Sequence, residues 1–416
     1  MPMRPAASAI ACSLAALAVM AGSASSVAAQ VTFQDASKDL ASPDAGVRLA
    51  AVRALRDAGD AGAALPLAPL VADPDRSVRL EAVSAEVSLF LDDDRRRSPR
   101  AAFDAGPFVL RQQAVPIEVL TALRAGARDV DPMVSVAAMY AFGTLGTQPT
   151  GAVRADLLRD VAADLGAILL AQEPELRLAT IRVVGRLYGR RQGEKVVYQD
   201  VGDAVVGAVN DRSDRHRAAA MQALGVMRYV PAVEALAELY AYYQRGPMAE
   251  AALDALAHIA APQSAPLFQA AITGTSLTLK RIGVEGLARL GDRAYDAEVR
   301  AAVRTERSQA MLLAGSFAEL LIGAGSLDGI VNGLSRADVR EQAMGYLLEI
   351  APGRAGLFGR YTQDPEPRVR IGVADALGVS GDLSAVSIVE AMRRDVDPAV
   401  VRAAERALAR LRADTR

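Results

Sequence analysis

The chain has 416 residues, of which 51% are hydrophobic but only 4% aromatic, and it contains no tryptophan. The 47 basic and 49 acidic residues give a formal net charge of -2. This balance argues against a dedicated nucleic-acid-binding protein, which needs a basic face. The length exceeds what one compact core usually holds, so we expect several domains or a repeat array.

The N-terminal segment has the pattern of an export signal. Arg4 precedes an apolar stretch at 6–21, and small residues follow, with Val27 and Ala29 at the -3 and -1 positions of a cleavage site. The alternative is an uncleaved membrane anchor, but the apolar stretch is shorter than the roughly 20 residues that a spanning helix needs. We therefore predict a signal peptide at 1–29, cleavage after Ala29, and a periplasmic or secreted protein. The only cysteine, Cys12, lies in this segment, so the mature chain would have no thiol.

The rest of the chain is built on one repeated helical pattern. In the clearest copy the anchor Val369 is followed by Arg370, then by Val373 and Leu377 at offsets of four and eight, then by Gly378. Offsets of 0, 4 and 8 lie on one face of a helix. We interpret the glycine as a helix stop.

The pattern recurs throughout the sequence. From residue 216 onward consecutive anchors are 30 to 32 residues apart, and a second amphipathic stretch such as 232–243 or 384–393 lies between copies. The anchors are at positions 47, 78, 134, 176, 216, 248, 279, 309, 339, 369 and 400. Hairpins of about 30 residues are typical of solenoid repeats. We predict an all-α, right-handed α-solenoid of about eleven hairpins over 30–416, with the second helices lining the concave face.

A short hallmark accompanies several copies. Asp73-Pro74 precedes Val78-Arg79, and Asp364-Pro365 precedes Val369-Arg370, with alanine, leucine and glycine following at helical spacing. This hallmark resembles that of the HEAT-like repeats of the phycobilin-lyase type. The resemblance implies that the arginine after the anchor bridges neighbouring repeats, often to such an aspartate. The residues expected in this structural ladder are Asp73, Arg79, Asp364, Arg370 and Arg340. Bilin lyases act on a pigment in the cytoplasm, which does not fit an exported chain, so the resemblance supports the fold only.

Three insertions interrupt the period, near 92–113, 146–153 and 189–199. Insertions in repeat proteins form loops that often carry recognition, so Arg190 and Arg191 are candidate partner-binding residues; the alternative is a solvated loop without a partner. Tyr240, Tyr242 and Tyr243 are further candidates, because tyrosine suits binding surfaces. Their alternative role is core packing with one tyrosine capping the turn.

No pattern of catalytic or metal-binding residues is visible. The chain has two histidines, His216 and His258, and lacks HExxH, GxSxG and phosphate-loop motifs. We expect no catalytic residue, no cofactor and no metal site. The predicted function is a non-catalytic scaffold or adaptor outside the cytoplasm that binds a protein or peptide on the concave face, with no nucleic acid and no stable membrane insertion after signal cleavage. The alternatives are an enzyme or enzyme accessory subunit whose site a partner completes, and an envelope-assembly factor that binds client proteins.

Overall fold

The computed structural model describes residues 34–92, 98–106, 109–111, 113–149, 151–189, 198–323 and 325–413. These residues form helices and turns and no strand, and the helices pack in chain order. The predicted all-α solenoid is therefore confirmed. The signal peptide predicted at 1–29 lies outside the described residues. None of the described helices is long and apolar enough to cross a membrane.

The chain divides into two compact units, which are described one at a time. Unit 1 comprises Met1–Asp104 with Val115–Phe142, and unit 2 comprises Ala105–Ala114 with Gly143–Arg416. That 30–416 is a single domain stays a prediction.

Unit 1 contains three first helices, meaning helices that carry an anchor: α2 (Ala45–Ala58), α4 (Arg76–Leu89) and α7 (Pro132–Leu145). The elements between them are η1 (Ala61–Ala63), α3 (Ala64–Leu67), η2 (Ala68–Ala72), α5 (Pro99–Ala105) and α6 (Ile117–Gly126). The first predicted insertion thus contains a short helix, α5.

Unit 2 continues the alternation. Its first helices are α9 (Pro174–Leu187), α11 (Asp214–Met227), α13 (Pro247–Ile259), α15 (Leu277–Leu290), α17 (Gln309–Ile322), α19 (Arg340–Ile350), α20 (Pro367–Gly378) and α22 (Pro398–Ala413). The second elements are α8 (Gly151–Leu169), α10 (Gln199–Ala208), η4 (Val230–Ala232) with α12 (Val233–Tyr243), η5 (Pro262–Ser264) with α14 (Ala265–Thr273), η6 (Arg293–Tyr295) with α16 (Asp296–Arg304), α18 (Asp328–Gly333), η7 (Ala355–Gln363) and α21 (Ala385–Met392). The second insertion is short because α8 already begins at Gly151, and most of the third lies outside the described residues.

The anchors form the core that the periodicity predicts. Val78, Val134, Val369 and Val400 are almost wholly buried, as are the residues four and eight positions later in most copies. The anchor of α2, Val47, is 40% exposed. The apolar stripe therefore holds each hairpin to its neighbours through the hydrophobic effect.

The hallmark glycines bring first helices together. Gly185 and Gly225 lie inside α9 and α11, and a Cβ at either position would lie 3.0 Å from the Cα atom of Ala223 or Ala255 on the next first helix. The interpretation as a helix stop is therefore wrong for Gly185 and Gly225, whereas α20 does end at Gly378. Gly185 and Gly225 are needed because the neighbouring backbone leaves no room for a side chain.

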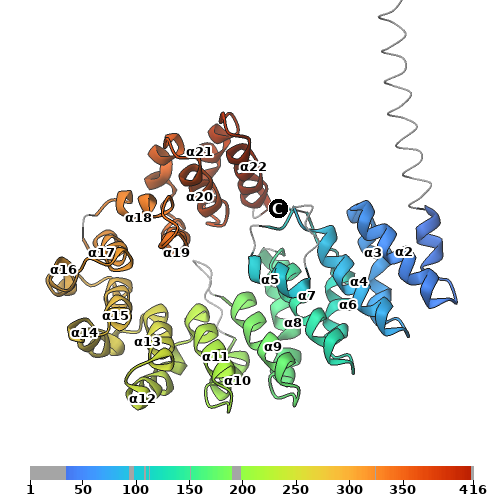
Figure 1. Ribbon diagram of the computed structural model, residues 1–416, viewed down its shortest axis with the longest axis horizontal. Helices are drawn as coiled ribbons and strands as arrows, with labels where there is room; N and C mark the ends of the chain where they lie inside the picture. Colours follow the sequence, from blue (N-terminus) through green and yellow to red (C-terminus); the bar gives the residue numbers. More distant parts are fainter. Residues whose placement is uncertain are drawn as a thin grey trace, which may run out of the picture. The chain divides into compact units, whose positions relative to one another are not determined.

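This close packing places the first helices of unit 2 on the inner side of its curved row (Figure 1). The first helices α9, α11, α13, α15 and α17 contact one another in sequence, whereas the second helices α10, α12, α14 and α16 lie on the outer side and contact one another far less. The expectation that second helices line the concave face is wrong for this unit, because small residues narrow the spacing on the side of the first helices.

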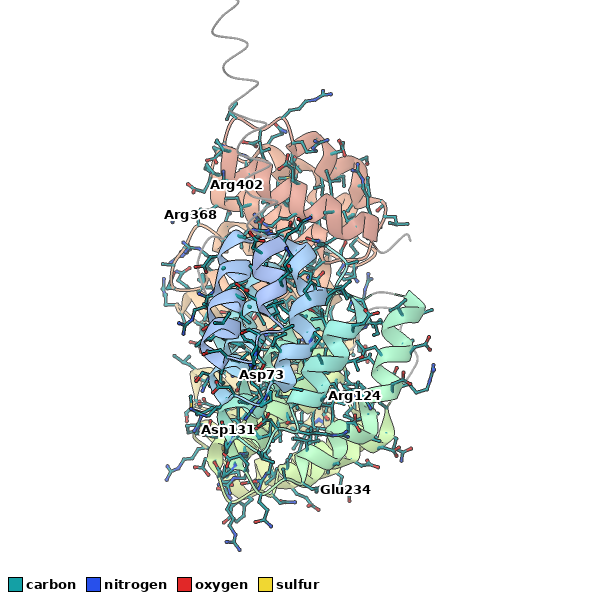
Figure 2. All side chains as sticks on the ribbon, turned by 90° about the vertical axis from the view of Figure 1, so that its right-hand side faces the viewer. Asp73, Arg124, Asp131, Glu234, Arg368 and Arg402 are labelled. Carbon is teal, nitrogen blue, oxygen red and sulfur yellow. The ribbon has the colours of Figure 1, made fainter. Side chains whose placement is uncertain are left out.

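The arginine after the anchor joins consecutive repeats. In unit 1, Arg48 donates from Nε and Nη2 to the carboxylate of Asp73 at 2.7 Å each, and from Nη1 to the carbonyl of Ser42 at 2.8 Å. Asp73 and Asp131 precede α4 and α7 in the chain, and both are labelled in Figure 2. One guanidinium thus fastens its own loop and that of the next repeat.

The other expected ladder residues have different partners. Arg79 pairs with Asp129 at 2.8 Å, and Arg370 pairs with Asp395 at 2.7 Å. Asp364 accepts the backbone N–H of Glu366 at 2.9 Å, and Arg340 donates to the carbonyl of Leu334 at 2.8 Å. The inter-repeat pair is therefore formed where an aspartate follows about 25 residues later or across the insertion, and Arg340 fastens only its own loop.

One first helix carries an ionisable side chain in the core. Glu86 stands eight residues after Val78, in the position that Leu55 and Leu377 fill in their own helices, and its side chain is fully buried. Neither carboxylate oxygen has a hydrogen-bond partner among the residues that the structure describes. Burial raises the pKa of Glu86 to about 9, because the apolar surroundings disfavour the charged form.

We expect Gly378→Ala to lower the free energy of unfolding by about 1–3 kcal/mol, because its new Cβ would lie 2.6 Å from the Cα of Ala407. The matched control is Gly207→Ala on α10, where a Cβ meets no atom within 4 Å. This variant should be stabilised by about 0.5–1 kcal/mol through the loss of glycine's conformational freedom. Urea unfolding measures both, and equal effects would contradict the close-packing role.

We expect the stability of the wild-type chain to fall as the pH rises from 5 to 9. The folded-state pKa of Glu86 is raised, so the folded protein holds its proton more tightly than the unfolded chain, and the resulting loss is up to about 1.4 kcal/mol per pH unit. Glu86→Leu should remove this slope and raise stability at pH 8. Urea unfolding at pH 5, 7 and 8.5 tests this, with Glu118→Gln, an exposed carboxyl on α6, as control. A Glu86→Leu slope equal to that of the wild type would refute it.

Candidate functional site: a polar cluster on the inner face of unit 2

Charged side chains occupy the sixth and tenth positions after successive anchors of unit 2. They are Asp254 and His258 on α13, Glu285 and Arg289 on α15, and Glu349 on α19. Positions six and ten lie one helical turn apart on the same face. On an isolated amphipathic helix this face would be exposed, but here it belongs to the inner row of first helices. The inner cluster, as we define it, consists of Arg228, Asp254, His258, Arg281, Glu285, Arg289, Tyr346 and Glu349.

Arg289 is the centre of the inner cluster, with a side chain that is only 5% exposed. Its Nε donates to both carboxylate oxygens of Glu349, at 3.0 and 3.1 Å, and its guanidinium carbon lies 5.2 Å from the ring centroid of Phe317. Its Nη1 lies 3.8 Å from Glu285 and has no hydrogen-bond partner. Arg289 therefore reaches across α17 and connects α15 to α19.

Glu285 forms the buried floor of the inner cluster. Its carboxylate accepts hydrogen bonds from Arg281 and from the Tyr346 hydroxyl, and one from Gln342 Nε2 at 3.5 Å. The ring of Tyr346 stacks on Phe317 with centroids 4.2 Å apart. Burial and the adjacent Glu285 carboxylate raise the pKa of Tyr346 well above its usual value, so its hydroxyl stays a donor.

Arg228, Asp254 and His258 form the accessible edge of the inner cluster, with side chains 43%, 38% and 35% exposed. Arg228 follows the end of α11, and its Nη2 lies 3.4 Å from Glu349 on α19. Repeats in a solenoid ordinarily contact only their neighbours. Here one ion pair joins the end of α11 to α19, although α13, α15 and α17 lie between them in the chain.

Glu349 and Asp254 of the inner cluster are held in their charged form. Burial opposes ionisation of Glu349, but the adjacent Arg289 outweighs this effect and lowers the pKa of the carboxyl. Burial likewise opposes ionisation of Asp254, and its hydrogen bond with His258 lowers the pKa below the usual value. The inner cluster contains equal numbers of carboxyl and guanidinium groups, three of each, together with the His258 imidazole.

Within the described ranges, no group of three or more histidine, cysteine, aspartate or glutamate side chains is placed to hold a metal ion. What the inner cluster offers is a set of fixed hydrogen-bond donors and acceptors. Of its exposed members, Arg228 is held by Glu349, and His258 and Asp254 hold each other, an arrangement that suits recognition of a polar group.

The structure places the predicted partner-binding tyrosines elsewhere. Tyr240, Tyr242 and Tyr243 lie on α12, an outer helix, and Tyr242 is 79% exposed. Tyr242 and Tyr243 meet edge to face with centroids 5.0 Å apart, and the Arg217 guanidinium lies 6.0 Å from the Tyr243 ring. The three tyrosines are therefore brought together, but on the side opposite to the inner cluster. Arg190 and Arg191 lie outside the described residues, so their role stays a prediction.

The inner cluster was missed from the sequence, although the sequence contains a signal for it. Charged residues recur six and ten positions after the anchors, as in Asp254 with His258, Glu285 with Arg289, and Arg406 with Arg410. A solvent-facing stripe has the same pattern, and only the curvature of the row distinguishes the two.

What the chain shares with known proteins is its fold. No family model and no curated protein matches the sequence. Among solved structures, yeast importin-β is similar with a TM-score of 0.56 at 12% identity, covering 92% of this chain and 57% of its own. An engineered protein gives 0.47 at 17% identity, covering 92% and 99%, and human deoxyhypusine hydroxylase gives 0.31 at 16% identity, covering 63% and 99%. The chain has a HEAT-like repeat fold, and it spans little more than half the length of importin-β.

We expect Glu349→Gln to lower the free energy of unfolding by on the order of 3 kcal/mol, because it leaves the buried Arg289 charge without its partner. The double variant Arg289→Met/Glu349→Leu should recover most of this loss. Glu341→Gln, at an exposed position of the same helix, is the control and should change stability by less than about 0.5 kcal/mol.

Urea unfolding at pH 7 measures all three variants. The folded-state pKa of Glu349 is lowered, so its contribution is present above the unfolded pKa and is lost as the pH falls through the folded value. The difference in the free energy of unfolding between the wild type and Glu349→Gln should therefore become smaller at acidic pH. A double variant as unstable as the single one would contradict the pairing.

Proposed function

We propose that this protein is a non-catalytic binding scaffold that works outside the cytoplasm and holds a protein or peptide partner against the inner face of unit 2. The observation that carries the proposal is the inner cluster itself. Its half-exposed polar groups lie on closely packed first helices, where Arg228 pairs with Glu349 and His258 pairs with Asp254. Preorganised groups bind with little loss of side-chain entropy.

Two features support a polar peptide or protein over other partners. The exposed edge offers both donors and acceptors, which suits a polypeptide surface. The charges of the inner cluster balance, whereas a nucleic-acid site would present a basic face.

We also assign the repeats to the phycobilin-lyase type of HEAT-like repeat, on the Asp-Pro and Val-Arg hallmark and on pairs such as Arg370 with Asp395.

Partner binding is tested by affinity capture from an extracytoplasmic extract, with the chain that begins at Gln30 as bait. We expect a partner that is recovered with the wild type and with Arg300→Gln, but lost with Arg228→Gln/His258→Asn. Arg300 is a suitable control because it is 58% exposed on the outer helix α16. No partner, or equal recovery with all baits, would overturn the scaffold proposal.

Export rests on the pattern at 1–29 and has its own test. We expect the protein isolated from its native cell to begin at Gln30 by N-terminal sequencing, because Val27 and Ala29 fit a signal-peptidase site. Replacing Ala29 with phenylalanine should block cleavage and leave a longer, membrane-retained precursor. Recovery of the wild-type protein with its first 29 residues intact would contradict export by this route.

A further inference from the structure

We infer that the exposed edge of the inner cluster is a binding site for a carboxylate group of the partner, which Arg228 and His258 hold between α11 and α13. The inference rests on the proposed scaffold function and specifies what this surface recognises.

The hydrogen-bonding groups of the inner cluster are unbalanced in favour of donors. Glu349 accepts from Arg289 and Arg228, and Glu285 accepts from Arg281, Tyr346 and Gln342, so these acceptors are occupied. The remaining carboxylate, Asp254, lies 3.5 Å from His258 Nδ1. The Arg228 guanidinium has five N–H groups, but within the described residues it makes one hydrogen bond, at 3.4 Å, and the side chain is 43% exposed. An incoming anion would supply acceptors that the protein itself does not provide.

His258 adds a donor whose presence depends on pH. Its Nδ1 lies 2.9 Å from the carbonyl oxygen of Asp254 and 3.5 Å from the Asp254 carboxylate, so two acceptors hold the proton on this nitrogen. Nε2 then carries a proton only when the ring is positively charged. The end of α11 approaches α13 here, since a Cβ at Gly225 would lie 3.4 Å from His258 Cβ. A protonated His258 on α13 and Arg228 at the end of α11 then present two cationic donors on neighbouring repeats, a suitable arrangement for a carboxylate.

The groups around His258 set the pH range. Burial lowers the pKa of the imidazole and Arg289 opposes its charge, but the hydrogen bonds and charge of Asp254 together raise the pKa above 6.5. Glu349 also faces it, since His258 contributes to the lowered pKa of that carboxyl. Glu319, exposed at the matching position of α17, is a further acidic residue on this row. Carboxylate binding should therefore strengthen as the pH falls from 8 to 6 and the imidazole takes up its proton.

A polypeptide partner can supply the carboxylate group from two sources, an acidic side chain or its own C-terminus. The test uses three fluorescein-labelled Gly/Ser decapeptides. The first has a central Asp-Glu pair and an amidated end, the second has a free C-terminal carboxylate and no acidic side chain, and the third has Asn-Gln and an amidated end. Binding to the chain from Gln30 is followed by fluorescence anisotropy at low ionic strength, at pH 6, 7 and 8.

We expect at least one carboxylate peptide to bind about tenfold or more tightly than the amidated Asn-Gln peptide at pH 6, and less tightly at pH 8. Arg228→Gln should abolish the preference, His258→Asn should remove its pH dependence, and Arg300→Gln should leave both unchanged. Circular dichroism confirms that each variant is folded. Equal binding of all three peptides, or a preference that survives in Arg228→Gln, would overturn the inference. If the partner is still captured through the inner face in that case, the scaffold proposal stands and only its chemistry is wrong.

Discussion

The close approach of successive first helices is the constraint on which the rest of unit 2 depends. Gly185, Gly225 and Gly378 leave no room for a side chain between one first helix and the next, and an alanine of the next helix stands opposite each of them. The second helices have no comparable contact, so the row bends toward the first helices. A replacement of glycine here therefore changes more than local packing, since the inner face exists only because the two sides of the repeat differ in width.

Bending turns a polar surface into a partly buried one, and this explains the composition of the inner cluster. Glu285 and Arg289 stand where an isolated helix would face water, yet their side chains are only 3% and 5% exposed. Buried charges are stable only when paired and hydrogen-bonded. Arginine suits this role because its planar fork reaches two carboxylates at once, as Arg289 does with Glu349 and Glu285. Lysine is rare in the chain, with Lys38, Lys195 and Lys280 as its only copies.

The sequence predicts the order of the helices well and their curvature poorly. Offsets of four and eight from an anchor depend on the geometry of a single helix, so the stripe that begins at Val369 is visible without a structure. Curvature depends on how two helices approach, and the glycine of the pattern was interpreted only as a helix stop, which fits Gly378 at the end of α20 but not Gly185 and Gly225 inside their helices. The same limit applies to Asp254 and His258, whose spacing fits both a solvated face and a buried network.

Stability alone does not explain why the inner cluster consists of charged residues. A buried ion pair seldom stabilises a protein more than apolar residues of similar volume, because desolvation offsets most of the attraction. Eight residues after the anchor, the other first helices carry leucine, valine or phenylalanine, and Glu86 is the exception, with a carboxyl that has no hydrogen-bond partner among the described residues. In the inner cluster, by contrast, each carboxylate has a partner and donors are left over at the exposed edge. A network with that surplus is organised for a group that arrives from outside, which is the property that a binding surface needs and a purely structural one does not.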